Sequence, residues 1–500
     1  MSDQYFHGVK VIEITDGPRA VRTLASSVIG LVGTAPDAQG VATAALVQGT
    51  VAANNGITYT AAATGQAGNN VSLTIRTPGG TNQPLTILVS SKSISVLLAT
   101  GSVAGVSTTT AAQLIAALAA NTAVTALLTC AATGASTGVG LVANLAQTYL
   151  AGGQDAVAPL NTPVLVSSGA DIGKFGTDGT LPQALADIFD QAEASIIVVR
   201  VAEGVDDAAT LANVIGGSNG TTYTGLKALL GAEGATGLIP RIIIATGFSD
   251  KIAVAQEMLV EAAALKAVAV IDGPNTSDAA AYAYSQNFGS ARAYLVDPGV
   301  KIYDTLTRTT IDAPASARVA GLIAKNDTER GFWWSPSNQE LLNILGTSRP
   351  VDFSFNDPNS RANYLNSLGI ATLIRQGGFR LWGDRTLSAD PAFAFLSVRR
   401  TADIIEDSVQ RAHLWAVDRN ITKAYFQEVI ASVQGYLDSL KALGAILDGS
   451  INANKDLNTP TNLAAGKVYF DISFTPPAPA EQVTFRVNPT STTGYANILQ

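Results

Sequence analysis

The middle of the chain alternates between strand-like and helix-like spacing of its apolar residues. Helical spacing is seen at residues 251–266, with Asp250 as the predicted N-cap, and at residues 277–287. Between and around these segments lie short apolar runs of strand length, at residues 195–201, 241–245, 267–271 and 293–296. A repeated strand-helix-strand order predicts a mainly parallel sheet covered by helices. A further long helix is predicted at about residues 315–329.

Residues 41–154 have a different character, because Arg76 and Lys92 are their only charged side chains. Residues 110–121 predict a helix with a threonine N-cap. Strict alternation and short apolar runs predict strands at residues 57–60, 71–75 and 85–89. Junctions rich in Gly, Pro and Asp flank the segment on both sides. We therefore predict a compact α+β module inserted into another domain.

The last part of the chain combines a strand and turn rich in Trp and Arg, at residues 374–386, with two amphipathic helices. In the second helix, apolar residues recur at steps of three and four: Tyr425, Val429, Val433, Tyr436, Leu440 and Leu443.

Short alternating strands are predicted at both ends of the chain. The C-terminal one follows a proline-rich spacer at residues 476–479, which cannot be helical. A terminal strand either closes a sheet of its own subunit or adds to a sheet of a neighbour, and both possibilities stay open. The C-terminal strand places Val483, Phe485 and Val487 on one face, and the short strand near the start contains Val9, Val11 and Ile14.

Charged residues make up 14% of the 500-residue chain, against about 25% in an ordinary soluble protein. The outside must therefore be covered by neutral polar and small residues, or be buried against other subunits. The length predicts two to four domains or one elaborated domain. A net charge of −8 argues against nucleic acid as a partner. The start does not look like a signal peptide, and no apolar window is long enough for a membrane segment.

Candidate chemistry is sparse. The chain has two histidines, His7 and His413, so histidine catalysis and His-rich metal sites have little material, and His413 is predicted to be a packed helix residue. Cys130 is predicted to be a buried thiol, in a protein kept in a reducing cytosol. Glycines at 138–143 and the Gly-Lys at 173–174 match phosphate-binding loops only loosely. We predict no cofactor, no metal and no catalytic residue.

Two groups of carboxylates are predicted to form solvated ion pairs on helix faces, the second of them beside Arg399, Arg400 and Arg411. They are Asp206 with Asp207, and Asp403 with Glu406 and Asp407.

Residues 372–422 resemble, almost position for position, the C-terminal region of the tail sheath proteins of contractile-tailed bacteriophages and R-type pyocins. Residues 1–38, 331–341 and 463–488 are similar to other parts of the same family. Residues 41–154 depart from its shorter members and resemble a module of assorted phage structural proteins. The residues that carry the resemblance best are Gly378, Phe379, Arg380, Trp382, Gly383, Arg385 and Thr386, with Trp333, Pro336 and Asn338 upstream.

The motif itself is predicted to serve packing. Its glycines allow tight turns, Phe379 and Trp382 pack, and Arg380 or Arg385 cap carbonyls or pair with Asp384 or Asp390.

The resemblance implies a multidomain fold of mixed α/β and α+β type. Its predicted parts are an N-terminal arm (1–22), a central α/β sheath domain of subtilisin-like topology (23–40 and 155–370), the inserted module (41–154), a C-terminal α+β sheath domain (371–475) and a C-terminal arm (476–500). With no histidine between His7 and His413, the central domain is not predicted to be an enzyme.

The function implied is that of a virion structural subunit, assembled in the bacterial cytoplasm. It polymerises helically around an inner tail tube, between baseplate and tail terminator, and contracts to drive the tube through the host envelope. The arm strands join neighbouring subunits. Lys423 and Lys441 are candidates for the tube contact, unless they are ordinary surface lysines.

Two further hypotheses fit parts of the sequence. The uncharged segment and the acidic balance also suit a homopolymeric surface-layer or adhesin protein. The strand-helix order alone also suits an α/β hydrolase-like enzyme, although a fold by itself says little about function.

Overall fold

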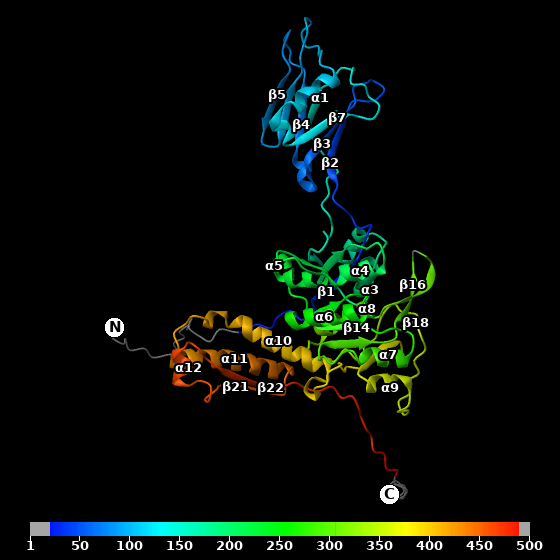
Figure 1. The fold of residues 1–500 in the computed structure, drawn as a ribbon, viewed down its shortest axis with the longest axis vertical. Helices are drawn as coiled ribbons and strands as arrows, with labels where there is room; N and C mark the ends of the chain where they lie inside the picture. The colour runs from blue at the N-terminus through cyan, green and yellow to red at the C-terminus, as the bar shows by residue number, and fades with distance from the viewer. Residues whose placement is uncertain (1–20, 306, 490–500) are drawn as a thin grey trace, which may run out of the picture.

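The computed structural model describes residues 21–305 and 307–489 (Figure 1). Its largest element is an eight-stranded sheet in which six strands run parallel and the two edge strands, β9 and β20, run antiparallel. A mainly parallel sheet is what the alternating pattern predicted. In spatial order the strands are β20 (Phe379–Trp382), β19 (Ile370–Arg375), β15 (Ala293–Val296), β14 (Val268–Asp272), β13 (Ile242–Ile244), β1 (Ile29–Thr34), β10 (Ile196–Val201) and β9 (Val164–Val166).

Helices cover both faces of this sheet, so its central strands are buried on both sides. Leu31 and Val198 face a core shared with α3 (Leu181–Phe189) and α8 (Ser316–Glu329). Their sequence neighbours Val32 and Val199 face the opposite core, because successive side chains of a strand alternate between its faces. The helices on that side are α4 (Asp207–Ile215), α6 (Ile252–Leu265), α7 (Asp278–Ser285) and α9 (Arg361–Ser367), with the short α5 (Ala232–Thr236) beside them.

The helix starts show one error in the predicted caps. Asp250 does not cap α6, since Lys251 holds the N-cap position without a side-chain hydrogen bond and Asp250 pairs with Lys251. Helix α8 is capped from another element: the backbone N–H of Ser316 donates to Asp272 Oδ1, at the end of β14, over 2.8 Å. Burial of Asp272 raises the pKa of its carboxyl group, and the hydrogen bonds from Ser316 and Ser249 oppose this rise.

The domain built around the eight-stranded sheet, here called the body, also contains two small sheets. The first is a hairpin joined by a third strand, namely β16 (Val300–Asp304), β17 (Thr309–Ala313) and β18 (Gly346–Thr347). The second pairs β11 (Gly217–Ser218) with β12 (Tyr223–Thr224).

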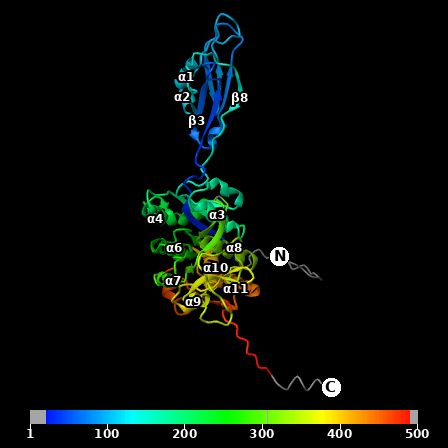
Figure 2. The same ribbon diagram turned by 90° about the vertical axis from the view of Figure 1, so that its right-hand side faces the viewer.

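The segment between β1 and β9 forms a separate lobe that stands away from the body (Figures 1 and 2). Two sheets and a helix enclose its own apolar core. The helix α1 (Ala111–Ala119) begins as predicted, because Thr110 caps it in a capping box with Gln113. One sheet contains β2 (Thr43–Gln48), β3 (Ile57–Thr64) and β7 (Leu128–Ala132); the other contains β5 (Thr86–Ser90), β6 (Ser93–Leu97), β4 (Ser72–Arg76) and β8 (Leu145–Tyr149), and α2 is Thr122–Thr125.

The two chain segments that join this lobe to the body run antiparallel and hydrogen-bond to each other. Ala42 N donates to Gln154 O over 2.9 Å, and Gln154 N donates back to Ala42 O over 3.1 Å. Val157 N donates to Gln39 O over 3.0 Å, and Gln39 N reaches the carbonyl of Lys174 on the body over 2.7 Å. The lobe is thus attached through a short paired ribbon and not through a single free linker.

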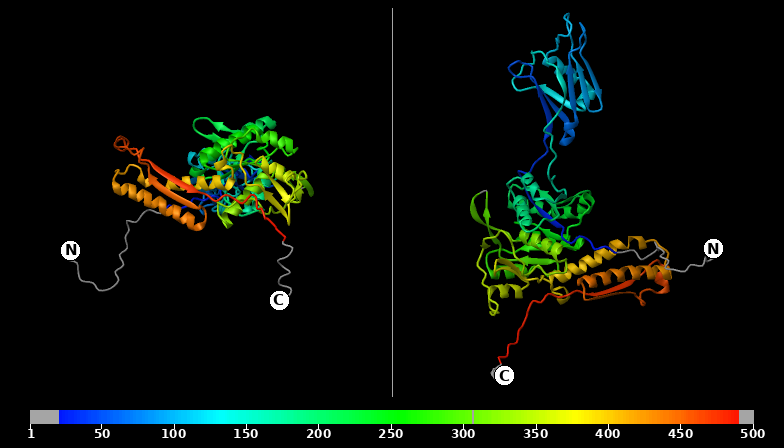
Figure 3. Two further views of the ribbon diagram at one scale, coloured as in Figure 1. Left: turned by 90° about the horizontal axis from the view of Figure 1, so that it is seen from below. Right: turned by 180° about the vertical axis from the view of Figure 1, so that it is seen from behind.

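The C-terminal part extends sideways from the body (Figure 3). Its core lies between α10, α11 and a two-stranded sheet, and includes Phe332, Ile405, Val433 and Leu440. Leu443, predicted to lie on the same apolar face, is 64% exposed at the end of α11. The elements are α10 (Leu396–Ala412), α11 (Lys423–Leu443), β21 (Asp448–Ala453), α12 (Pro460–Ala464) and β22 (Phe470–Thr475).

Among the helices of the described residues, none combines the length and the apolar character needed to cross a bilayer.

The paired ribbon makes a direct test of the predicted module possible. We expect that replacing residues 43–153 by Asn-Gly, which closes the Ala42 and Gln154 pair as a two-residue hairpin, leaves the body folded. The melting temperature of the body, measured by circular dichroism, should change by only a few degrees. As a control in the full chain, Leu114→Ala should destabilise the lobe by about 2–5 kcal/mol and spare the body. Collapse of the body in the shortened chain would contradict the prediction.

Candidate functional site

The C-terminal segment, residues 476–489, pairs with no sheet of the described chain. Val483, Phe485 and Val487 are 66%, 85% and 86% exposed. The possibility that this strand closes a sheet of its own subunit is therefore not what the structure shows. Addition to a neighbour stays a prediction. The N-terminal residues Val9, Val11 and Ile14 lie outside the described residues.

A sheet with open edges lies next to the start of this segment. β21 and β22 pair antiparallel with each other, and neither has a second strand partner among the described residues. Phe470, Ile472 and Phe474 of β22 are half-buried against the core of the C-terminal part, while the residues between them are exposed. Unpaired strand edges of this kind bind further strands readily.

The family motif forms the hairpin from β19 to β20 and packs, as predicted. Gly378 has φ +125°, and a Cβ there would lie 2.3 Å from Glu340 Oε1, so glycine is required. Arg380 caps two carbonyls, those of Gln376 at 2.9 Å and Asn338 at 2.7 Å. Trp382 packs edge-on against Phe353 with ring centroids 5.0 Å apart.

The upstream motif residues close the outer edge of this hairpin. Asn338, with φ +62°, donates its backbone N–H to Leu381 O over 2.6 Å, which places residues 338–341 alongside β20. Pro336 is buried, and Trp333 packs edge-on against Phe332 at 5.1 Å. The eight-stranded sheet is thereby protected at the edge that β20 forms.

The predicted carbonyl capping is found at Arg380, but the alternative of local pairing is not found at Arg385, which pairs with neither Asp384 nor Asp390. Its Nε and Nη2 donate to the two carboxylate oxygens of Glu481, over 2.7 and 2.5 Å. Asp384 is buried and accepts from Ser397 Oγ at 2.7 Å, and Asp390 accepts from Ala392 N at 2.9 Å. The two acids are engaged at the start of α10 and of a short 3₁₀ turn, which leaves Arg385 to hold the C-terminal segment.

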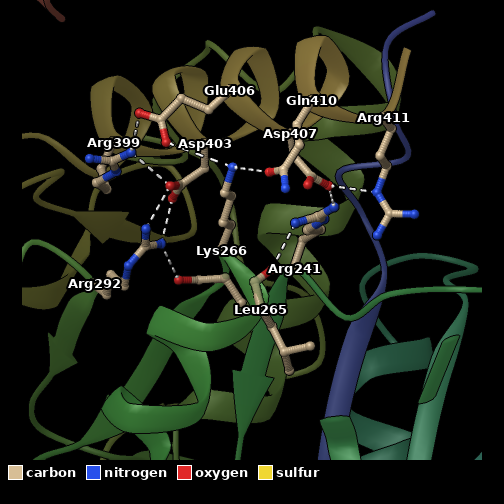
Figure 4. A network of polar contacts seen from close by, with 11 residues as sticks. Arg241, Leu265, Lys266, Arg292, Arg399, Asp403, Glu406, Asp407, Gln410 and Arg411 are labelled. Atoms are coloured by element: carbon tan, nitrogen blue, oxygen red, sulfur yellow. Dashed lines mark hydrogen bonds and ion pairs between the residues drawn. The ribbon is translucent and has the colours of Figure 1, made fainter. Parts of the chain in front are cut away.

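A network of polar contacts joins α10 to the sheet (Figure 4). A basic residue precedes each of three adjacent parallel strands. Arg241 and Arg292 stand directly before β13 and β15, and one residue separates Lys266 from β14. Because parallel strands start at the same edge of a sheet, these three side chains lie in a row. We call them and the acids they face on α10 the ion ladder.

The two arginine pairs of the ion ladder are short and largely buried. Arg292 donates twice to Asp403, over 2.6 and 2.7 Å, and once to the carbonyl of Ala267 at 2.9 Å. Arg241 pairs with Asp407 and also donates to Leu265 O over 2.7 Å. Each arginine thus binds both α10 and the chain that leads into the adjacent strand. Fork-to-fork contacts with a carboxylate fix geometry as well as adding energy.

Further contacts widen the ladder. The Lys266 ammonium group donates to Gln410 Oε1 over 3.1 Å and lies 4.0 Å from the carboxylate of Glu406. Arg399 of α10 reaches Asp403 at 2.7 Å and stacks on Phe393 at 4.3 Å. Arg411 shares Asp407 with Arg241 and reaches Glu233.

One more buried pair, at the other side of α10, ties Arg400 to Asp327 of α8 at 2.6 Å. The same Arg400 donates to Ser26 O over 3.0 Å. Helix α10 is therefore fixed to the sheet, to α8 and to the chain before β1.

Electrostatics agree with this geometry at Asp407. Burial acts to raise the pKa of Asp407, but the positive charges of Arg241 and Arg411 outweigh it and hold the pKa below its usual value. The carboxylate is thus kept charged in a site that would otherwise favour its neutral form.

The prediction of solvated ion pairs is wrong for Asp403 and Asp407, which are 2% and 7% exposed. Glu406 is about half exposed, as expected for a solvated ion pair. Asp206 caps α4 by accepting from Ala209 N at 2.7 Å. The missed signal is the basic residue that precedes three successive apolar runs.

The remaining candidates are structural. Cys130 is half-buried in β7, and burial raises the pKa of its thiol. His413 Nδ1 lies 2.7 Å from Val409 O at the end of α10, where the imidazole packs 6.0 Å from Trp415. Lys174 pairs with Asp171 at 2.8 Å. Within the described residues, no three His, Cys, Asp or Glu side chains are grouped to hold a metal ion.

The two lysines proposed for a tube contact lie on α11. Lys423 is exposed at its first turn, and Lys441 pairs with Asp448 at 2.8 Å near its end. The tube contact itself stays a prediction.

Comparison with protein-family models and known proteins gives a consistent result. Residues 221–387 match the phage tail sheath protein central domain, residues 388–490 match the phage tail sheath C-terminal domain, and residues 139–201 match the N-terminal region of domain III of tail sheath protein Gp18. A prophage major tail sheath protein of Pseudomonas aeruginosa (strain UCBPP-PA14) is 44% identical over 351 residues, which cover 70% of this chain and 91% of the relative. The chain belongs to the phage tail sheath family.

Further tail sheath proteins extend the match. The tail sheath protein of Escherichia phage P2 is 38% identical over 339 residues, covering 66% of this chain and 85% of that protein. The fold resembles the helical sheath of the anti-feeding prophage in its contracted state, with a TM-score of 0.53, 21% identity, and coverage of 66% of this chain and 89% of that one. The protein is a structural subunit of a contractile tail sheath, and this replaces the surface-layer and hydrolase-like hypotheses.

In the sheath subunit, the ion ladder predicts a large effect of losing one acid. Asp403→Ala leaves Arg292 buried without its carboxylate, so we expect the free energy of unfolding to fall by roughly 3–5 kcal/mol. Asp448→Ala, which breaks the exposed pair with Lys441, should leave the free energy of unfolding nearly unchanged, because water screens that pair. Urea denaturation of the unassembled chain measures both. Equal, small losses would show that the ladder does not hold α10.

Asp384 predicts a pH dependence. Burial raises its pKa to about 7, although hydrogen bonds from Ser397 and the charge of Arg400 oppose the rise. Between its unfolded pKa near 4 and about pH 7, the folded chain binds more protons than the unfolded chain, so this group makes stability fall as pH rises. Asp384→Asn should flatten that part of the stability profile between pH 4 and 7, measured by urea denaturation. An unchanged dependence of stability on pH would show that Asp384 is not the group responsible.

Proposed function

We propose that this sheath subunit joins its neighbours by strand addition, in which residues 483–487 of one copy pair with an open edge of the β21–β22 sheet of another. The observation that carries the proposal is the exposure of Val483, Phe485 and Val487 at alternating positions of a segment that pairs with no strand among the described residues. The N-terminal strand, with Val9, Val11 and Ile14, would bind in the same manner.

The acceptor sheet suits this role. Backbone groups along the outer edges of β21 and β22 have no strand partner in the part of the chain that the structure describes, so a further strand would satisfy them. An added strand would place its apolar face beside half-buried Phe470, Ile472 and Phe474. Burying each Val or Phe side chain contributes about 1.5–3 kcal/mol before the cost of ordering the arm.

Strand addition also fits a sheath that changes its shape. Main-chain hydrogen bonds hold the arm, and alternating side chains set its register, so a connection can persist while the bodies move. In the full assembly the subunits would stack helically around an inner tail tube, between baseplate and terminator, in tails assembled in the bacterial cytoplasm. Contraction would drive the tube through the host envelope. Solved relatives of the same fold include a baseplate complex and a contracted helical sheath.

The experiment compares the two faces of the arm. Val483→Glu, Phe485→Glu and Val487→Glu together should abolish tube formation, because the added charges would have to be buried against the acceptor sheet. Electron microscopy and sedimentation of the expressed chain measure tubes and free subunits.

The matched control places the same three charges on the other face, as Gln482→Glu, Thr484→Glu and Asn488→Glu, and should still form tubes. Deleting residues 482–500 should leave free subunits. Normal tubes from the deletion would exclude the arm as the connection.

A further inference from the structure

The C-terminal arm does not leave the body where the last strand ends. After β22 ends at Thr475, Pro476, Pro477 and Pro479 remain partly buried, whereas every residue from Ala480 to the last described one, Pro489, is exposed. Prolines restrict the chain to stiff, extended conformations of about 3.1 Å per residue. The segment therefore follows the surface as a stiff strut and separates from it at about residue 481.

The separation point coincides with the ion pair between Arg385 and Glu481. Among the described residues, no other hydrogen bond or ion pair joins residues 476–489 to the rest of the chain. Both guanidinium contacts go to the same carboxylate, at 2.7 and 2.5 Å, so the pair fixes direction as well as distance.

The body side of this pair is held rigidly. The Arg385 guanidinium lies over the Phe395 ring at 5.3 Å, and the two residues form a backbone bridge. Its neighbours in the chain, Asp384 and Thr386, are both buried, and Thr386 Oγ1 donates to Phe393 O over 2.9 Å. Arg385 is thus presented at a defined place beside the start of α10.

We propose that the Arg385–Glu481 pair is a releasable clip that sets the exit point, direction and free length of the C-terminal arm. This inference rests on the proposed function, in which the arm reaches a neighbouring copy. When the clip is closed, the arm pivots at Glu481. When it is open, the arm pivots at Thr475, and the chain between the two pivots adds up to about 20 Å of reach.

Exposure makes the clip suited to release. Both side chains of the pair are 41% exposed, and pairs in water add little to stability and weaken with salt. The clip therefore orients the arm without holding the fold together. A sheath whose subunits change their spacing could draw on the extra length while the arm strand stays paired.

The test measures the direction of the arm in the unassembled full chain. Cys130→Ser first removes the native thiol, and spin labels are then attached at Gln427→Cys on α11 and Thr484→Cys on the arm. Pulsed EPR measures the distribution of distances between the two labels. Both positions are exposed. We expect a narrow distribution that broadens with Glu481→Arg, broadens with Arg385→Glu, and narrows again when both charges are exchanged together. High salt should broaden the distribution of the parent chain.

The matched control is Glu428→Arg, which reverses one charge of a similarly exposed pair with Arg419, 2.9 Å long, and leaves the arm untouched. It should not change the distribution. An unchanged distribution in Glu481→Arg, or a failure of the double exchange to restore the narrow one, would overturn the clip. Because the measurement needs no tubes, this outcome is independent of whether the arm deletion abolishes assembly.

Discussion

The buried contacts between arginines at the start of adjacent strands and acids on α10 determine how the two main parts of the subunit sit together. Parallel strands bring their first residues to one edge, and Arg241, Lys266 and Arg292 are there because each precedes its strand directly or by one residue. Helix α10 lies along that edge with acids spaced to meet them. Moving the helix along the edge would leave these buried charges without partners, which is costly, so the pairs favour the observed position of α10.

The same contacts show what could and could not be predicted from the sequence. Strand and helix periods predicted the parallel sheet, the lobe helix at Thr110 and the amphipathic α11, because burial of one face imposes a period on the residues. Asp403 and Asp407 have the spacing of a solvated helix face, so the pattern predicted exposure. Their burial depends on a sheet edge formed by strands more than a hundred residues away in the sequence. The local spacing of apolar residues carries no information about that edge.

The arm contact was missed for a related reason. Arg385 has two acids within five residues, Asp384 and Asp390, and local pairing was the natural prediction. Both acids are already used, one by Ser397 and one by Ala392 N–H, so the guanidinium is left for Glu481, far along the chain. The resemblance to sheath proteins drew attention to the motif. It did not indicate which partner each motif side chain would take, because that depends on how neighbouring groups are already satisfied.

Burial divides the ion pairs of the subunit into two mechanical classes. Asp403 and Arg400 lose water on folding, so separating either from its partner would leave an uncompensated charge in the interior. Arg385 and Glu481 stay in contact with solvent, so water replaces either partner at small cost. If the arm joins neighbouring subunits as proposed, we therefore expect load on the arm to separate the exposed Arg385–Glu481 pair before the buried pairs of the ion ladder. The body would then keep its structure, and the arm would take up the movement.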